Sequence, residues 1–239
     1  MSVILGDCFD LLPTIPDGSV SLVLADLPYG TTQNKWDSVL DLAKLWGEYN
    51  RICTGAVILF SQGVFTAQVI ASNVGAFKYK LVWEKSKPTN FLNVSRQPLR
   101  KHEDICVFYR SQPTYNPQRS DGKPYSKGVR KDQMTGSYGE FAPVLVASEG
   151  GRHPTDIIYH KTAESEGPVV HPTQKPVGLL EYLIKTYSNP GDVVLDNAMG
   201  SGSTCVAAMR TGRNFIGIEK DEKYFAIASE RLRAERVAA

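Results

Sequence analysis

Residues 193–204 read VVLDNAMGSGST, which is a short apolar run, an acid and then a glycine-rich turn. The apolar run predicts a buried strand, and glycines let the backbone turn tightly and approach a ligand closely. A helix is expected to follow over residues 203–209. This strand, turn and helix indicate a ligand site at the carboxyl end of a strand in a parallel sheet.

A second acid narrows the class of ligand. The next predicted strand, residues 215–218, ends at Glu219, which lies 23 residues after Asp196. An acid at about this spacing accepts hydrogen bonds from ribose hydroxyls. The turn has no Gly-Lys-Ser/Thr phosphate loop, and Cys205 stands where a dinucleotide fingerprint needs a third glycine. An adenosyl ligand without phosphate fits better, and the acids suit a sulfonium cation.

Strands and helices alternate outward from this unit, which predicts an α/β fold with a mostly parallel sheet. Strands are expected at 3–5, 20–25, 56–60, 79–83, 105–109, 193–195 and 215–218, and helices at 40–52, 64–74, 177–187, 203–209 and 222–236. Four of the strands run into an acid: Asp7, Asp26, Asp196 and Glu219. Each acid alone fits a helix N-cap, but together they indicate a binding rim.

The strand at 20–25 leads directly into Asp26-Leu27-Pro28-Tyr29. The lone pair of an aromatic amine is delocalised into its ring, so the nitrogen is a poor nucleophile. The Asp26 carboxylate and a backbone carbonyl of Leu27 or Pro28 can accept the two amine hydrogens and rehybridise the nitrogen. Tyr29 can stack on a base that has left the duplex. An ordinary turn closed by Pro and Gly explains this segment equally well when it is taken alone.

Charge is uneven along the 239-residue chain. The net charge is only +2, but residues 84–131 hold 11 Lys/Arg against 4 Asp/Glu. A basic block on a nearly neutral protein indicates a local contact with a polyanion, and a solvated surface is the alternative. Candidate DNA contacts, most to phosphates and a few to base edges, are Lys85, Lys87, Asn90, Arg96, Arg100, Lys101, Arg119, Lys123, Lys127, Arg130 and Lys131. Asn90, Phe91, Tyr115 and Tyr125 are candidates for base flipping or stacking.

The remaining composition restricts the class of protein. Four scattered cysteines argue against disulfides and a zinc site, and no metal is expected. No signal pattern or long apolar run occurs, so a cytoplasmic protein without a membrane partner is predicted. Residues 111–170 show no regular period, which favours an insertion with its own function over a plain loop.

Four motifs resemble the amino-methylating DNA methyltransferases, specifically the permuted β-group of the adenine-N6/cytosine-N4 family. Residues 26–29 are similar to the catalytic Asp/Asn/Ser-Pro-Pro-Tyr/Phe/Trp, and residues 196–202 to the cofactor motif Asp-Pro-Phe-x-Gly-x-Gly. Gly6-Asp7-Cys8 resembles the family's N-terminal Gly-Asp-Cys, and residues 171–176 its His-Pro-Thr-x-Lys-Pro. The order of the motifs is that of the β-group, and the resemblance covers residues 6 to about 225.

The resemblance implies a Rossmann-like, circularly permuted methyltransferase fold in one domain, 1–239, with an inserted target-recognition region at 111–170. It implies S-adenosylmethionine as cofactor, double-stranded DNA as partner and a homodimer as a plausible assembly. The catalytic residues implied are Asp26, Leu27, Pro28 and Tyr29. Cofactor contacts are implied for Asp7, Cys8, Asp26, His171, Thr173, Lys175, Asp196, Asn197, Gly200, Ser201, Gly202, Ser203, Thr204 and Glu219.

Two departures from the family pattern stand out. Leu27 replaces the first proline of the catalytic motif, but its backbone carbonyl is retained. Asn197-Ala198 replace the usual Pro-Phe. Neither change by itself indicates an inactive enzyme, although the loss of the Phe removes a contact to the cofactor or to the target loop.

The target base is predicted from Asp26. Asp in this position resembles the adenine enzymes, whereas the cytosine amino enzymes more often have Ser, so adenine-N6 is expected. Cytosine-N4, an RNA or protein substrate, and a non-catalytic module that binds cofactor and DNA remain alternatives. Methylation at cytosine carbon-5 is disfavoured because it needs a thiolate and no Pro-Cys pair occurs. The recognition sequence, and a restriction–modification, orphan or phage origin, are left open.

Overall fold

The computed structural model describes residues 1–30, 39–130 and 142–238. The strands of the main sheet are Ser2–Leu5 (β1), Val20–Ala25 (β2), Cys53–Ser61 (β3), Phe77–Thr89 (β4), Arg100–Phe108 (β5), Ile157–His160 (β10), Val193–Asp196 (β11) and Asn214–Glu219 (β12). The α-helices are Cys8–Leu11 (α1), Leu42–Ile52 (α2), Val64–Ser72 (α3), Val177–Tyr187 (α4), Ser203–Arg210 (α5) and Glu222–Ala238 (α6). Short 3-10 turns cover Leu12–Thr14 (η1), Phe91–Asn93 (η2) and Ala163–Ser165 (η3).

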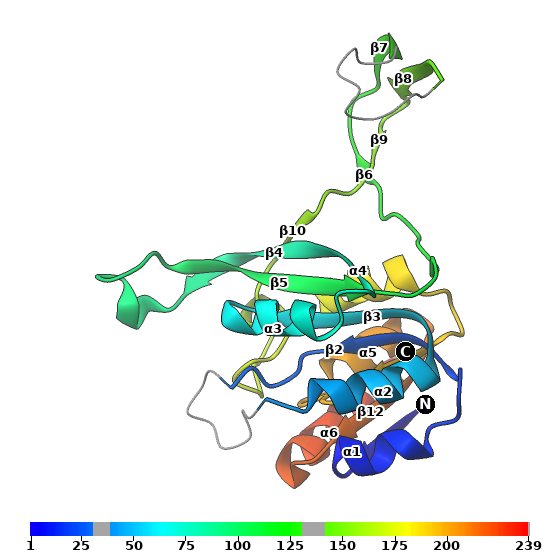
Figure 1. Ribbon diagram of the computed structural model, residues 1–239. Helices are drawn as coiled ribbons and strands as arrows, with labels where there is room; N and C mark the ends of the chain where they lie inside the picture. The colour runs from blue at the N-terminus through cyan, green and yellow to red at the C-terminus, as the bar shows by residue number, and fades with distance from the viewer. Residues whose placement is uncertain (31–38, 131–141, 239) are drawn as a thin grey trace. The chain divides into compact units, whose positions relative to one another are not determined.

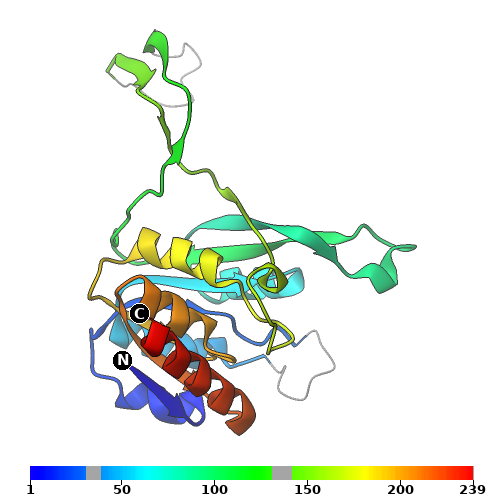
Figure 2. The same cartoon turned by 180° about the vertical axis from the view of Figure 1, so that it is seen from behind.

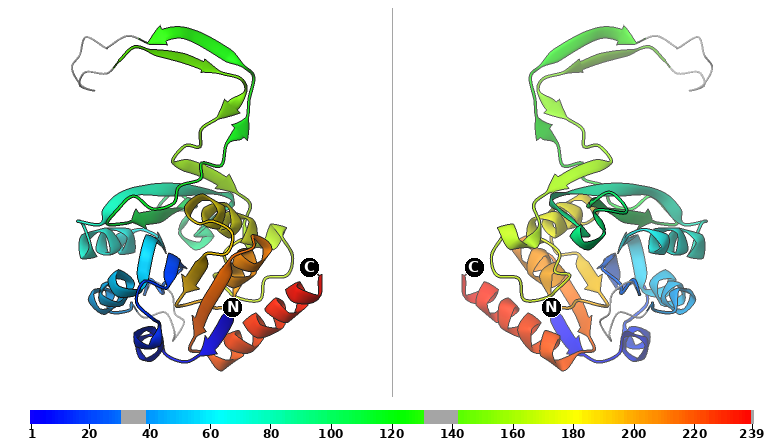
Figure 3. Two further views of the ribbon diagram at one scale, coloured as in Figure 1. Left: turned by 90° about the vertical axis from the view of Figure 1, so that its right-hand side faces the viewer. Right: turned by 90° about the vertical axis from the view of Figure 1, so that its left-hand side faces the viewer.

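The main sheet is mixed and mostly parallel, which confirms the predicted fold class (Figure 1). Its strand order is β1-β12-β11-β2-β3-β5-β4-β10. Only β5 runs against its neighbours β3 and β4, and the other adjacent pairs are parallel. The first strand, β1, forms one edge of the sheet and pairs with β12, the last strand of the sheet in sequence (Figure 3).

Helices cover both faces of the sheet. Helices α1, α2 and α3 lie on the face seen in Figure 1, and α4, α5 and α6 on the face seen in Figure 2. The strands show why both faces are buried: in β2, Leu22 and Leu24 pack into one core, while Val23 and Ala25 pack into the other. Alternate side chains of a strand point to opposite faces, so a continuous apolar run is what a doubly covered parallel strand requires.

The stretch 111–170 is more regular than expected. The strand β10 lies within it, and this strand joins the main sheet parallel to β4, with Ile158 opposite Trp83. Only Ile158 of its four residues is buried, although Ile157-Ile158-Tyr159 form an apolar run as long as Val193-Val194-Leu195. The strands expected from the sequence did not include residues 157–160, so β10 was missed.

A separate compact unit, Pro117–Thr155, forms the core of the inserted stretch; it is called the insert unit below. Its described strands are Ser120–Asp121 (β6), Tyr125–Arg130 (β7), Val144–Ser148 (β8) and Gly151–Arg152 (β9). The strands form two antiparallel pairs, β6 with β9 and β7 with β8. The unit lies within the stretch 111–170.

The four cysteines, Cys8, Cys53, Cys106 and Cys205, are buried and free of disulfides. Within residues 1–30, 39–130 and 142–238, no helix has the length and apolar character to cross a membrane. In the same ranges, no three His, Cys, Asp or Glu side chains cluster in a way that could hold a metal ion.

Candidate active site

A cleft of about 960 Å³ opens where the parallel strands end. Parallel strands deliver the residues after their carboxyl ends to one edge of the sheet. The structure accordingly brings together Asp7 after β1, Asp26 after β2, Asp196 at the end of β11 and Glu219 at the end of β12. The four acids, far apart in the sequence, line a single cavity.

One end of the cleft is built by β1, β11, β12 and the turn before α5. Asp196 is buried, and its Oδ1 accepts the Ala198 backbone N–H at 3.1 Å. Burial raises the pKa of Asp196 to about 7, against the hydrogen bonds from Thr204 and Ala198. Near neutral pH this carboxyl is thus poised between its charged and neutral forms, and a cationic ligand would favour the charged form.

Glu219 holds the glycine turn at the same end. Its Oε2 accepts the Gly200 N–H at 2.8 Å, and its Oε1 accepts the Asp221 N–H at 2.8 Å. Burial is the main reason that the pKa of Glu219 is raised. Gly200 has a φ of +51°, a conformation that favours glycine. The backbone of the glycine turn therefore lines the cleft next to the Glu219 carboxylate, which can accept further hydrogen bonds.

Asn197, which replaces the family's proline, contacts α2. The Tyr49 hydroxyl donates a hydrogen bond to Asn197 Oδ1 at 2.6 Å. Asn197 is buried, lines the cleft, and its Nδ2 has no hydrogen-bond acceptor among the described residues. A buried donor without a partner is costly, so this atom fits a ligand that carries acceptors.

His171 and Thr173 also line the cleft. The Thr173 backbone N–H lies 3.3 Å from His171 Nδ1, and the His171 ring packs edge-on against Tyr224 with centroids 4.2 Å apart. Burial, with a smaller effect of Lys175, lowers the pKa of His171 to about 4. The imidazole is therefore neutral at neutral pH.

The other end of the cleft holds the predicted catalytic loop. The Tyr29 hydroxyl donates to Asp26 Oδ1 at 2.7 Å, and Lys175 Nζ donates to Asp26 Oδ2 at 2.5 Å. The Tyr29 ring stacks on Phe65, with centroids 4.9 Å apart. Leu27 is buried in the core under α1, α2 and α3. An apolar anchor thus occupies the position of the missing proline.

Two further charged groups complete this end. Lys85 from β4 and Glu103 from β5 form an ion pair, and Glu103 Oε2 lies 3.3 Å from Lys175 Nζ. Lys85, Glu103 and Lys175 are each at least nine-tenths buried. Together with Asp26 they form what is called the charge quartet below. It balances two acids with two lysines.

The quartet shifts the acidities of its members. Burial raises the pKa of Asp26, and Lys175 opposes that rise. Burial would also raise the pKa of Glu103, but Lys175 and Lys85 outweigh it and the pKa is lowered. For Lys175, burial would lower the pKa, but Asp26 and Glu103 reverse the sign and raise it. Lys175 is therefore charged at neutral pH.

The sequence-derived cofactor residues are largely gathered in the cleft. All of them are described, and only Gly202 stands outside its lining. Gly202 has a φ of +77°, and a Cβ there would lie 2.9 Å from the Cβ of Ala228 in α6. The absence of a side chain at Gly202 thus lets α5 and α6 pack closely together, next to the turn that lines the cleft.

The sequence-derived DNA contacts are dispersed. Asn90 and Arg100 line the cleft, and Lys87, Arg96 and Lys101 are exposed on the β4–β5 hairpin. Arg119, Lys123 and Lys127 are exposed in the insert unit. Only the backbone of Arg130 is described, and Lys131 lies outside the described residues. Lys85 differs from the expectation, since it is buried against Glu103 and is not available to a phosphate.

Sequence reasoning missed Glu103 as a site residue. Lys175, which the sequence assigned to the cofactor, lines the cleft. Its Nζ lies against Asp26 and over the rings of Tyr29 and Phe60, 5.7 and 5.1 Å from their centroids. An available signal was the His102-Glu103-Asp104 cluster at the start of a strand otherwise rich in apolar residues.

Comparison with known proteins agrees with this geometry. The DNA methylase family N6_N4_Mtase matches residues 20–230. The type II methyltransferase M.HinfI of Haemophilus influenzae is 27% identical over 270 residues, which cover 97% of this chain and 68% of that protein.

Solved structures share the fold. The M1.HpyAVI–SAM complex matches with a TM-score of 0.64 and 24% identity, over 96% of this chain and 98% of that one. The cytosine-N4-specific PvuII DNA methyltransferase matches with a TM-score of 0.68 and 17% identity, over 96% and 85% of the two chains.

Proposed function

The chain belongs to the N6/N4 family of DNA methylases, and from that premise we propose that it methylates the N6 amino group of adenine in double-stranded DNA. As a member of this family, it is a methyltransferase that uses S-adenosylmethionine and acts on DNA. The choice of adenine rests on one observation, the carboxylate of Asp26 at the wall of the cleft.

The residues of the cleft fit this cofactor. Asp196 and Glu219 offer carboxylates to a ligand with cationic and hydroxyl groups, and Asn197 Nδ2 offers a buried donor. The cofactor supplies an electrophilic methyl group on a sulfonium. The residues of the protein bind the cofactor, exclude water, and hold the amine nitrogen so that its lone pair is directed at the methyl group.

Asp26 presents the amine. A carboxylate has about four acceptor positions, and Tyr29 and Lys175 occupy one on each oxygen. A further position remains for one amine hydrogen, and the Leu27 or Pro28 carbonyl accepts the other. The two acceptors hold the amine hydrogens out of the plane of the ring, so that the lone pair leaves conjugation with the ring and is localised on nitrogen. The proton released after transfer leaves through Asp26 or water.

Tyr29 holds the flipped base in this proposal. Phe65 covers one face of its ring, and the hydroxyl bond to Asp26 fixes the ring's rotation. A base that stacks on this ring, a contact worth about 1–3 kcal/mol, would lie beside the Lys175 ammonium, which stands 5.7 Å from the ring centroid. Stacking and amine recognition then depend on the same two residues.

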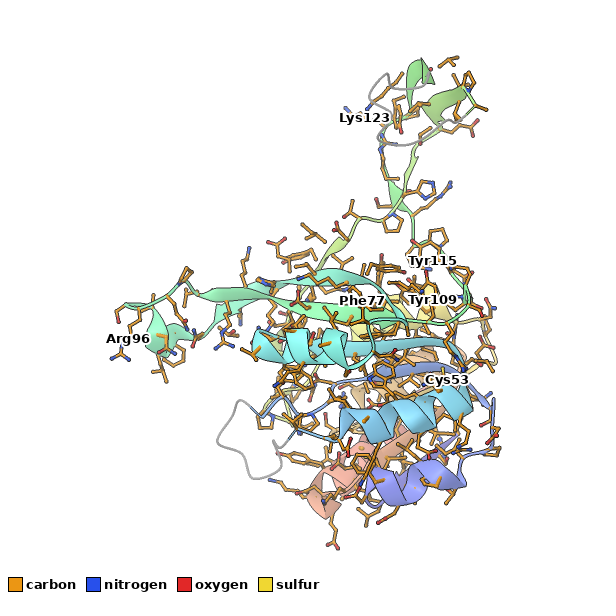
Figure 4. All side chains as sticks on the ribbon, in the orientation of Figure 1. Cys53, Phe77, Arg96, Tyr109, Tyr115 and Lys123 are labelled. Carbon is orange, nitrogen blue, oxygen red and sulfur yellow. The ribbon has the colours of Figure 1, made fainter. Side chains whose placement is uncertain are left out.

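The tip of the β4–β5 hairpin is proposed to meet the duplex. Phe91 and Leu92 are 74% and 82% exposed, and Arg96 stands at the same tip (Figure 4). Exposed apolar side chains flanked by cations suit a wedge between base steps with phosphates on either side. Asn90, at the start of the tip, has a φ of +71° and also lines the cleft. The tip and the cleft are therefore continuous.

The insert unit is proposed to read the target sequence. Its cations Arg119, Lys123 and Lys127 are exposed, and Arg152 packs over the Tyr125 ring with its guanidinium carbon 4.7 Å from the centroid. Lys123→Ala should lower the slope of log affinity against log salt by about 0.9 if it contacts a phosphate. An unchanged slope would remove Lys123 from the DNA interface.

Base-resolution sequencing of DNA from a methylation-free host that expresses this chain tests the target base. N6-methyladenine at one recurring sequence is the expected result. N4-methylcytosine in its place would show that Asp26 does not select adenine and would assign the cytosine reaction. The homodimer, which rests on the resemblance alone, is tested by sedimentation of the purified chain with and without DNA.

A further inference from the structure

The charge quartet is unusual because it places three buried charged side chains, Lys85, Glu103 and Lys175, beside the Asp26 carboxylate. Its members come from four places in the chain: the β2 end, β4, β5 and the loop before α4. Burying an ion costs several kcal/mol unless it is well paired. A pair of Asp26 and Lys175 would already be neutral, so charge balance alone does not require Lys85 and Glu103.

The contacts within the quartet are unequal. Lys175 Nζ is 2.5 Å from Asp26 Oδ2 but 3.3 Å from Glu103 Oε2. Glu103 Oε2 is buried without a hydrogen bond among the described residues, whereas Oε1 pairs with Lys85. The ammonium of Lys175 thus has one tight partner, and a second acceptor lies within reach.

We propose that Glu103 and Lys85 are positioning residues for Asp26: Lys85 fixes Glu103, and Glu103 provides the second acceptor that Lys175 uses when Asp26 binds the target amine. Lys175 keeps its contact with Asp26 Oδ2 in the resting enzyme, and when the amine takes an acceptor position still open on Asp26, the Lys175 ammonium shifts toward Glu103 Oε2, which lies 3.3 Å away. Without Glu103, that movement would leave a buried cation unpaired.

The surroundings restrict Lys175 to this short path. Its ammonium lies over the rings of Tyr29 and Phe60, and its side chain is 9% exposed. Water therefore offers it little alternative solvation. Lys85 is similarly enclosed, with its ammonium 5.2 Å from the centroid of the Trp83 ring. Among the described residues, Glu103 is the second carboxylate within ion-pair distance of Lys175.

The proposal rests on Asp26 as the group that meets the amine, as proposed above, and is tested with Glu103→Gln in the full-length enzyme. We expect kcat for methyl transfer to fall about 10- to 100-fold, the cost of a misplaced reacting group, with cofactor Kd within about threefold. Both limbs of the pH–rate profile should move to lower pH by about one unit. Removing the Glu103 charge lowers the pKa of its neighbours Asp26 and Lys175 alike.

Asp104→Asn is the matched control. Asp104 is the next residue of β5, is buried, and also pairs with a lysine, Lys80, at 2.7 Å, but it does not line the cleft. Its kcat and pH profile should equal those of the wild type. Glu103→Asp keeps the charge and should restore the wild-type pH limbs, with kcat between those of the wild type and Glu103→Gln.

Because Glu103→Gln leaves an excess buried cation, Lys85→Gln/Glu103→Gln serves as a second variant with a neutral cluster. It should melt within a few degrees of the wild type and still show the lowered alkaline limb. Wild-type kcat and pH profile in this double variant would overturn the proposal. An equal loss in Asp104→Asn would also overturn it, because that result would show a general effect on β5.

Asp26→Ala separates the role of Asp26 from the role of Glu103. If Asp26→Ala transfers methyl groups at the wild-type rate, the assignment of Asp26 to the amine fails and this proposal fails with it. If Asp26→Ala is inactive while both Glu103→Gln and the double variant behave as wild type, only the positioning role is wrong.

Discussion

The two ends of the cleft treat buried carboxylates in opposite ways. At the catalytic end, Asp26 and Glu103 are neutralised by the buried lysines 85 and 175. At the cofactor end, Asp196 has no ion pair among the described residues and relies on hydrogen bonds from neutral groups, so its pKa rises to about 7. At the catalytic end, the protein itself supplies the positive charges that balance the carboxylates. At the cofactor end, a cationic ligand can supply the positive charge that Asp196 lacks.

The largest expected effect is on methyl transfer, and it should leave cofactor binding at the other end of the cleft nearly unchanged. Asp26→Ala should reduce methyl transfer to DNA by about 10³-fold, because it removes the acceptor that localises the amine lone pair. Cofactor affinity, measured by calorimetry, should stay within about threefold. A parallel loss of cofactor affinity would show that the two ends are not independent.

This separation also explains what sequence reasoning could find. The rim of acids was predictable because each acid follows a parallel strand, and such strands deliver their ends to one edge. Glu103 was not predictable in this way. Because β5 runs antiparallel to its neighbours, its first residues, and not its last, lie at the edge where the parallel strands end. A search for acids after strands passes over a residue near a strand's start.

Lys85 and β10 were misread for related reasons. Lys85 lies in a polar, basic stretch of sequence, and only the fold shows that its β4 neighbours bury it against Glu103. Strand β10 is a short edge strand with one buried residue. Its apolar run, Ile157-Ile158-Tyr159, is brief and lies alone in a polar stretch, so its pairing with β4 is what identifies it as a strand. Tertiary pairing, which no local pattern carries, decides both cases.

The second prediction concerns the pH dependence of the cofactor end. A cationic ligand favours ionised Asp196, so binding should release a proton near pH 7 and affinity should rise about tenfold from pH 6 to pH 8. Calorimetry in buffers of different ionisation enthalpy measures the released proton. Asp196→Asn should abolish this dependence, and its persistence there would assign the titration to another group.

The same carboxyl affects the stability of the free protein with a definite sign. The folded-state pKa of Asp196, about 7, lies above its ordinary value of 3.8, so the folded chain retains a proton that the unfolded chain has lost. The contribution of Asp196 to the free energy of unfolding should therefore decrease as the pH rises from about 4 to about 7. The difference in denaturant unfolding between the wild type and Asp196→Asn isolates that contribution.

A smaller effect is expected from Tyr49, which contacts the cofactor end only through Asn197. Tyr49→Phe removes the 2.6 Å hydrogen bond to Asn197 Oδ1 and frees the amide to rotate. Cofactor affinity should fall about fivefold, equivalent to a net hydrogen bond of about 1 kcal/mol. If the affinity is unchanged, Asn197 Nδ2 does not donate to the cofactor. The melting temperature of the variant without cofactor serves as the control for a change in core stability.

The smallest expected effect comes from the exposed lysine at the cofactor end. Lys220 pairs with Asp7 at 3.1 Å, but its side chain is 78% exposed, against 9% for Lys175. Water and salt screen such a pair, which is worth about 0–1 kcal/mol, so Lys220→Ala should change cofactor affinity by less than about threefold. Any change should vanish in 0.5 M salt.

Lys175→Ala makes the same substitution at a buried lysine. It leaves Asp26 and Glu103 without the cation that they share. Its loss of methyl transfer should persist at high salt, since buried charges are screened far less than exposed ones. If the effect of Lys220→Ala equals that of Lys175→Ala and both resist salt, burial is not what distinguishes the two ends. The cofactor end would then hold a countercharge of its own.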